Sequence, residues 1–277
     1  MSIASFFVRP ALAGVIVGLG TMAAATAAQA QTAATASPAP VTAPVSAPPQ
    51  AAAPAPSWAL IAGYERDSHG SSYGFAGPAY VKPVRPGLAW TARVFGSYLT
   101  YEFSDLSGTT AVRSPGASGS LGLQFGERNT FTVTAGPSVA WRTATVTPLT
   151  GADIETSETR WGVNVGAEAY LNPTSHSNVQ ALVNYNTTDK YLWSRAAFKQ
   201  QISNLNGSGT SALSLGVEGI AQGNDDIRSL QGGGLLEIAH TPSSFSLTFR
   251  AGYKRSTFEV GPSRSGPYFG VGLYKRF

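Results

Sequence analysis

Hydrophobic and polar residues alternate along most of the chain after residue 56. This alternation is clearest in Phe131–Arg142, Trp161–Leu171, Phe245–Tyr253 and the final segment Ser265–Phe277. In the first of these, the apolar face carries Phe131, Val133, Ala135, Pro137, Val139 and Trp141. A period of two is the pattern of an extended strand, because successive side chains point to opposite faces. The pattern therefore predicts an all-β fold.

Turn-forming residues divide residues 57–277 into about twelve segments, with 10–14 as the expected range. The expected strands are Trp58–Arg66, Ser72–Lys82, Leu88–Phe103, Ala117–Gly126, Asn129–Thr143, Thr159–Leu171, Asn178–Asn186, Tyr191–Gln201, Thr210–Ala221, Arg228–Ala239, Phe245–Lys254 and Pro267–Phe277.

Both a soluble β-sandwich and a membrane β-barrel would show such strands. In a sandwich, the polar faces are usually dense in Lys and Glu, whereas here they are mostly Gly, Ser, Thr, Asn and Gln. Aromatic residues also stand near strand ends, as Trp58, Trp90, Trp141 and Phe277 do. Apolar strands of about ten residues with aromatic girdles and a polar interior are typical of outer-membrane barrels. We expect a single antiparallel transmembrane β-barrel.

The connections indicate an orientation for this barrel. Five of them are short turns rich in Pro, Gly, Asn and Ser: Lys82–Gly87, Gly126–Asn129, Asn172–Ser177, Asn204–Gly209 and His240–Ser244. The alternate set contains three long segments, Ser104–Gly116, Ala144–Glu158 and Arg255–Gly266. Because short periplasmic turns and longer outer loops are usual in barrels, we expect these three to be outer loops. An even number of strands then places the first and the last residue of the barrel on the periplasmic side.

Residues 1–30 read as a secretory signal peptide, with Arg9, the apolar stretch Ala11–Gly20 and an A-x-A site at Ala28–Ala30. Residues 31–56 are almost only Ala, Pro, Thr, Ser, Val and Gln, so we expect a disordered linker. Residues 57–277 remain for the barrel. The outer membrane of a Gram-negative bacterium is the expected location. Its lipid bilayer is an expected partner, as is the barrel-assembly machinery, which would recognise Phe277.

Composition excludes several classes of function. Cysteine is absent, which excludes thiol chemistry, and the net charge of +4 is spread without a Lys/Arg run, which argues against nucleic-acid binding. Three scattered histidines do not make a metal site, and no cofactor motif is present. The candidate groups for a hydrolase are Ser68, Ser71 or Ser72 as a nucleophile near His69 as a base, or the Glu218–Glu237 pair as glycosidase carboxylates. We expect no catalytic residues, because the spacing of neither set is specific.

If the apolar faces meet lipid, the opposite faces line the lumen. The charged candidates for the lumen are Arg93, Arg142, Glu168, Arg195, Lys199, Glu218, Glu237, Arg250 and Arg276. With Tyr101, Tyr170, Asn164, Gln180, Asn184 and Asn186 they offer rings and amides suited to a sugar chain. The alternative is structural, since such charges pair across narrow barrels and fill them. Lys275 is unusual on an apolar face: either it reaches the membrane interface beside Phe277, or the register is off by one.

Several short phrases, in this order, are similar to the cellulose biosynthesis protein BcsS family. They include Tyr73–Pro78, Trp90–Arg93, Tyr98–Glu102, Ala135–Ser138, Ala167–Pro173, Leu215–Glu218, Ala251–Tyr253 and Tyr274–Phe277. The resemblance covers about Trp58–Phe277. It implies an outer-membrane accessory role in the synthesis or export of cellulose, which is an exopolysaccharide of biofilms. It also implies contact with the glucan or with export components, and no catalytic residues. A porin-like channel for oligosaccharides or other solutes is the alternative, followed by an outer-membrane hydrolase.

Overall fold

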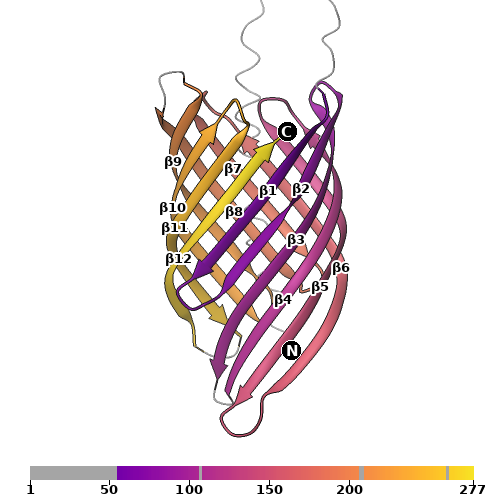
Figure 1. Cartoon of the computed structure of the whole chain (residues 1–277), viewed down its shortest axis with the longest axis vertical. Helices are drawn as coiled ribbons and strands as arrows, with labels where there is room; N and C mark the ends of the chain where they lie inside the picture. Colours follow the sequence, from indigo (N-terminus) through magenta and orange to yellow (C-terminus); the bar gives the residue numbers. More distant parts are fainter. Residues whose placement is uncertain (1–54, 106–107, 206–208, 260–261) are drawn as a thin grey trace, which may run out of the picture. The chain divides into compact units, whose positions relative to one another are not determined.

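A computed structural model describes residues 55–105, 108–205, 209–259 and 262–277. The predicted signal peptide and nearly all of the predicted linker lie outside these residues. The described part is a closed antiparallel barrel of twelve strands (Figure 1), which confirms the predicted antiparallel barrel and its strand count and excludes a sandwich. The strands are β1 Ser57–Asp67, β2 Ser72–Arg85, β3 Leu88–Asp105, β4 Gly108–Phe125, β5 Thr130–Pro148, β6 Ile154–Leu171, β7 Ser177–Asn186, β8 Tyr191–Asn204, β9 Ser211–Gly223, β10 Ile227–His240, β11 Phe245–Phe258 and β12 Arg264–Arg276. No helix in the described ranges is long and apolar enough to cross a membrane.

Each strand pairs with its neighbours in sequence, and β12 closes the barrel on β1. That seam runs from Ala59 opposite Arg276 to Asp67 opposite Tyr268. Closure leaves no strand edge unpaired, which removes the exposed backbone groups that an open sheet carries. We call the end where β1 begins and β12 ends the terminal rim, and the opposite end the distal rim.

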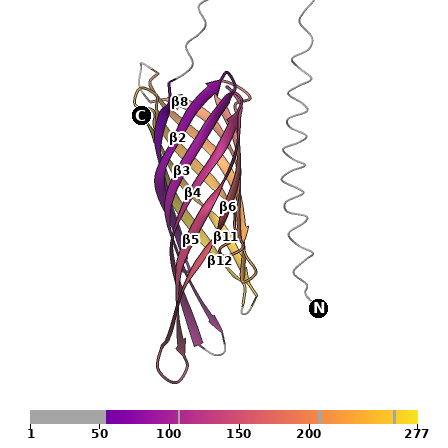
Figure 2. The same cartoon turned by 90° about the vertical axis from the view of Figure 1, so that its right-hand side faces the viewer.

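The prediction of long outer loops was wrong. The stretches at 104–116 and 144–158 are mostly strand, since β3 and β4 extend to Asp105 and Gly108, and β5 and β6 extend to Pro148 and Ile154. These extensions are rich in Thr, which favours strands, and they pair with each other without needing one apolar face. β3–β6 therefore form a wall that extends beyond the rest of the distal rim, with the β5–β6 hairpin longest (Figures 1 and 2).

The outward face of the barrel is apolar and exposed. Exposed outward side chains include Leu121, Val133, Val163, Val165, Val217, Leu230, Phe249 and Phe269. Aromatic side chains border this surface on both sides, so that on β5 Phe131 stands toward the terminal rim and Trp141 toward the distal rim. These two residues are ten positions apart (141 − 131), about 33 Å along a strand. Because barrel strands tilt by about 35–45°, the band is roughly 25 Å high, the height typical of barrels that span a membrane.

Lys275 also lies on the outward face, since it pairs in register with Leu60, which is 41% exposed. Its ammonium group donates to the carbonyl of Ser243 in the β10–β11 turn and lies 5.6 Å from the centre of the Phe277 ring. The register is therefore as predicted. The charge turns toward the rim, where a carbonyl and an aromatic face stabilise it.

Candidate functional site

Charged side chains on the inward face form ion pairs between strands. Arg93 on β3 forms a bidentate ion pair with Glu168 on β6, in which Arg93 Nη2 donates to Glu168 Oε2 at 2.9 Å. Arg195 Nε donates to Glu218 Oε2 at 2.7 Å, and Lys199 Nζ donates to Glu237 Oε2 at 2.7 Å. Six of the nine charged residues predicted to line the lumen are therefore held in three ion pairs.

The other three predicted residues have different surroundings. Arg142 donates to the hydroxyl oxygen of Tyr101 at 3.1 Å and lies 4.0 Å from Glu158. The Arg250 guanidinium lies against Gly270, where a Cβ would come within 3.1 Å of it. Arg276 is exposed at the terminal rim, opposite Ala59 in register.

The half of the lumen toward the terminal rim is filled. Inward-facing residues here are buried, among them Ala79, Ala89, Thr91, Thr132, Ala197, Lys199, Glu218 and Leu235. Because these side chains point inward and yet have almost no contact with solvent, they pack against one another and leave no wide water-filled passage. Thr248 on β11 adds a hydrogen bond of 3.1 Å to Glu237. We call this filled region the lumen plug.

Tyr268 on β12 is also part of the lumen plug. It is 2% exposed, and its hydroxyl donates to Glu218 Oε1 at 3.0 Å. The ring crosses Gly233 and Gly252, where an added Cβ would lie 2.7 Å and 2.8 Å from Tyr268 atoms. The glycine-rich run in β10 thus makes room for an aromatic ring, which is a packing role.

Two further polar contacts tie β1 to the strands beyond its seam with β12. Gln231 Nε2 donates to Glu65 Oε1 at 2.8 Å, and Lys254 Nζ lies 3.0 Å from Asp67 Oδ2. Asp67 also accepts hydrogen bonds from the backbone N–H groups of His69 and Ser71, which stabilises the β1–β2 turn.

A cavity of about 340 Å³ lies between the lumen plug and the distal rim. Arg93, Glu168 and Tyr170 border it on the side of the lumen plug. Its aromatic lining consists of Tyr73, Phe75, Phe95, Tyr101, Tyr170, Tyr191 and Trp193. Amide side chains also line it: Asn164, Asn184, Asn186, Gln222 and Asn224. Tyr73 faces inward and is nevertheless 40% exposed, so this part of the lumen is open to solvent.

Sequence reasoning missed five of these seven aromatic residues as lumen residues: Tyr73, Phe75, Phe95, Tyr191 and Trp193. The necessary signal was present on β8, because Arg195 was placed inward and Trp193 and Tyr191 lie two and four positions before it. Residues of equal parity share a face of a strand. Among the five tryptophans, all of which the structure describes, Trp193 is the one that faces the lumen; Trp58, Trp90, Trp141 and Trp161 are exposed on the outward face.

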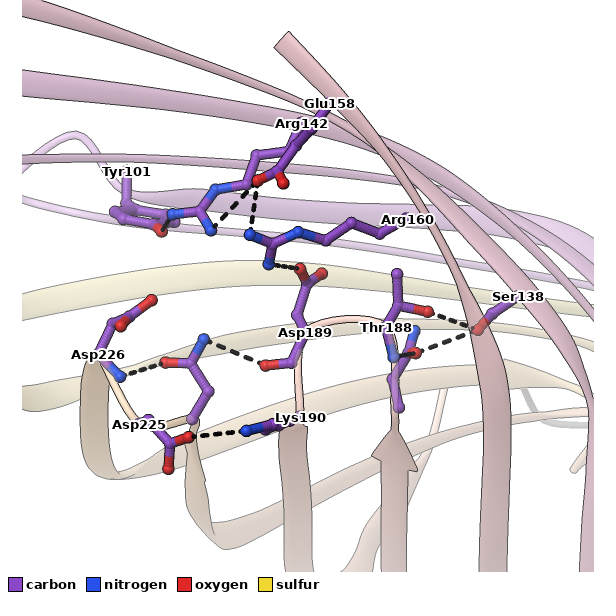
Figure 3. A network of polar contacts seen from close by, with 12 residues as sticks. Tyr101, Ser138, Arg142, Glu158, Arg160, Thr188, Asp189, Lys190, Asp225 and Asp226 are labelled. Carbon is purple, nitrogen blue, oxygen red and sulfur yellow. Dashed lines mark hydrogen bonds and ion pairs between the residues drawn. The ribbon is translucent and has the colours of Figure 1, made fainter. Parts of the chain in front are cut away.

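A polar network braces the distal rim beside this cavity (Figure 3). Arg160 on β6 binds Glu158 at 2.5 Å and Asp189 of the β7–β8 turn at 3.1 Å. The backbone carbonyl of Asp189 accepts from Asn224 at 3.3 Å, and Ser138 hydrogen-bonds Thr188 at 2.8 Å. These contacts connect the long β5–β6 hairpin to the β7–β8 turn, and that turn to the β9–β10 turn.

The groups that a hydrolase would need are not assembled. His69 Nε2 lies 3.2 Å from the Ser265 carbonyl oxygen, and the Ser72 hydroxyl bonds Thr100. Glu218 and Glu237 are each bound to their own cation. Within the described ranges, no cluster of three or more His, Asp or Glu side chains could hold a metal ion.

Comparison with known protein families assigns the chain. The model of one family, cellulose biosynthesis protein BcsS, matches residues 56–277. The chain belongs to the BcsS family. No curated protein matches the chain.

Solved structures similar to this chain are distant. The β domain of the Bordetella autotransporter BrkA aligns with 80% of this chain and 98% of its own length, at 10% identity and a TM-score of 0.45. The monoaromatic hydrocarbon channel CymD aligns with 80% of this chain and 88% of its own, at 11% identity and a TM-score of 0.41. A Pseudomonas aeruginosa FadL homologue aligns with 80% of this chain and 90% of its own length, at 8% identity and a TM-score of 0.37.

Proposed function

We propose that this member of the BcsS family is an outer-membrane barrel that supports bacterial cellulose synthesis or export without catalysing a reaction. The observation that carries the proposal is the family match over residues 56–277, the whole barrel. The exposed apolar band and its aromatic borders support a place in the outer membrane, since only a closed barrel or a helix can satisfy every backbone group in lipid. The terminal rim would face the periplasm.

Two features support a role other than catalysis or free diffusion. The carboxylates of the lumen plug are neutralised by Arg93, Arg195 and Lys199, so none is placed as a free acid or base. The same ion pairs and the buried side chains around them occupy the path that a solute would need. A porin-like channel remains the second candidate, because the lumen is lined by polar groups.

Deleting the gene in the bacterium that encodes this chain tests the proposal. We expect lower or differently textured cellulose, measured as glucose released by cellulase and by fibre microscopy, with output restored by the wild-type gene. Unchanged output and texture in the deletion strain would refute the role. Fractionation of the complemented strain should find the protein with the outer membrane, and its recovery in another fraction would refute the location.

A further inference from the structure

The open cavity at the distal side of the lumen plug has aromatic walls from opposite sides of the barrel. Tyr73 and Phe75 come from β2, and Tyr191 and Trp193 come from β8. In the order of twelve paired strands, β2 and β8 are six strands apart in either direction and so lie across the lumen from each other. The cavity is therefore a slot between two aromatic surfaces.

Several polar groups in this slot have no protein partner. Asn184 Nδ2 donates to Asn164 Oδ1 at 2.7 Å, which uses one group of each amide. Within the part of the chain that the structure describes, Asn184 Oδ1, Asn164 Nδ2 and the Gln222 amide are left without a protein hydrogen bond. In the lumen plug, by contrast, most charged groups are paired. Unpaired donors and acceptors beside aromatic rings are a frequent feature of small-molecule sites.

This combination matches the chemistry of a β-1,4-linked glucan better than that of an alkyl chain. A β-1,4 glucan is a flat ribbon whose two faces expose C–H groups and whose edges carry hydroxyls, so its faces can stack on rings while its edges bond amides. An alkyl chain would displace water from the amides and leave them unpaired, which costs about 1–3 kcal/mol for each buried group.

We propose that the cavity binds the end of a β-1,4-glucan chain, with Trp193 as the principal stacking surface and Asn164, Asn184 and Gln222 as hydroxyl partners. The inference rests on the proposed function and names the ligand of its interior. A volume of about 340 Å³ is near the lower limit of ligand sites, about 300–1,000 Å³. The cavity therefore holds a short segment at the end of the glucan chain. The lumen plug stops that segment at the Arg93–Glu168 pair, so the barrel holds a chain end and does not conduct it.

The test is binding of cellohexaose by the purified full chain in a micelle without a sugar headgroup, because a glucoside or maltoside detergent would compete. Calorimetry measures the affinity. Maltohexaose, which has the same sugar units in a curved α-1,4 chain, is the matched ligand control. We expect cellohexaose to bind and maltohexaose to bind at least about tenfold more weakly. Equal affinities, absence of cellohexaose binding, or displacement of cellohexaose by a fatty acid would overturn the proposal.

Variants of Trp193 then test whether the ligand binds in the cavity. Trp193→Ala should weaken cellohexaose binding by about tenfold or more, as expected for a stacking tryptophan, and Trp193→Phe should restore most of it. Trp161→Ala, on the outward face and 75% exposed, is the control and should leave affinity unchanged. Heat-dependent migration on gels checks that each variant is folded. Equal affinities of Trp193→Ala and Trp161→Ala, with a tenfold loss in neither, would place the ligand elsewhere and overturn the site.

This test is separable from the test of the proposed function. A deletion strain with altered cellulose, together with a wild-type protein that binds no cellohexaose, would leave the role standing and refute the cavity as a glucan site. Cellohexaose binding by the wild-type protein, together with unchanged cellulose in the deletion strain, would leave the glucan site standing and refute the role.

Discussion

Glu218 is the residue whose removal should disturb the lumen plug most. Its side chain is 0% exposed, and its two oxygens are bonded to Arg195 at 2.7 Å and to the Tyr268 hydroxyl at 3.0 Å. The Arg195 side chain is 13% exposed. Glu218→Gln keeps the size of the side chain and an acceptor for Tyr268 but removes the charge that balances Arg195.

The size of the effect follows from this geometry. Two unit charges 2.7 Å apart attract by about 6 kcal/mol at an effective dielectric constant of about 20. Part of that energy offsets the cost of taking both groups out of water. The variant leaves the largely buried Arg195 charge without its counter-ion, with the neutral Gln180 Oε1 at 3.1 Å as a remaining acceptor. We therefore expect the free energy of unfolding to fall by about 3–5 kcal/mol. Arg195→Gln combined with Glu218→Gln should be less destabilising than the sum of the single changes, because neither partner is then a buried lone charge.

Guanidinium titration of the barrel refolded into phospholipid bicelles, followed by tryptophan fluorescence, measures this free energy. The matched control is Lys190→Gln, which breaks a 3.6 Å pair with Asp225 whose side chains are 71% and 62% exposed. Such an exposed pair should contribute less than about 1 kcal/mol. The reasoning fails if Glu218→Gln costs no more than Lys190→Gln, or if the double variant is as destabilised as the sum of its parts.

Three further predictions concern the membrane band, the lumen plug and assembly. Ala135→Arg, in the middle of the apolar band, should lower the free energy of unfolding in vesicles by about 2–4 kcal/mol, and Thr147→Arg, beyond the band, by less than about 1 kcal/mol; equal effects would contradict the position of the band. The wild-type barrel should show no steady current in a planar bilayer, whereas combining Arg93→Gly with Tyr268→Gly should open one; a steady wild-type current would contradict the lumen plug. Deleting Phe277 should reduce the folded, heat-modifiable protein in the outer-membrane fraction, while Phe277→Trp should not; an undiminished amount after deletion would contradict recognition of the terminal aromatic residue.

The strands were predictable because their alternation is local. The segments around Phe131–Arg142 and Trp161–Leu171 read as strands with the faces that the structure has. The long connections were mispredicted for a physical reason: at 144–158 the outward positions carry polar residues, among them Thr145, Thr147 and Glu155, and a strand beyond the membrane needs no apolar outward face. Its partner strand stabilises it through backbone hydrogen bonds instead.

The partners within the lumen were not predictable. Arg93 and Glu168 are 75 residues apart, and Glu218 and Tyr268 are 50 residues apart. Parity along a strand assigns such side chains to the inward face. Which of them meet depends on strand tilt and on the stagger accumulated around the closed barrel, and neither quantity is encoded in a single segment.

The sequence by itself determined that this chain is built of strands with one apolar and one polar face, because a period of two requires no knowledge of distant residues. The phrases it shares with the BcsS family also determined its relatives. Only the tertiary structure decided that the polar faces close half of the lumen with ion pairs and leave the other half open. That division arises because barrel closure brings Tyr73 on β2 and Trp193 on β8 to opposite walls of one cavity, a proximity that depends on all twelve strands.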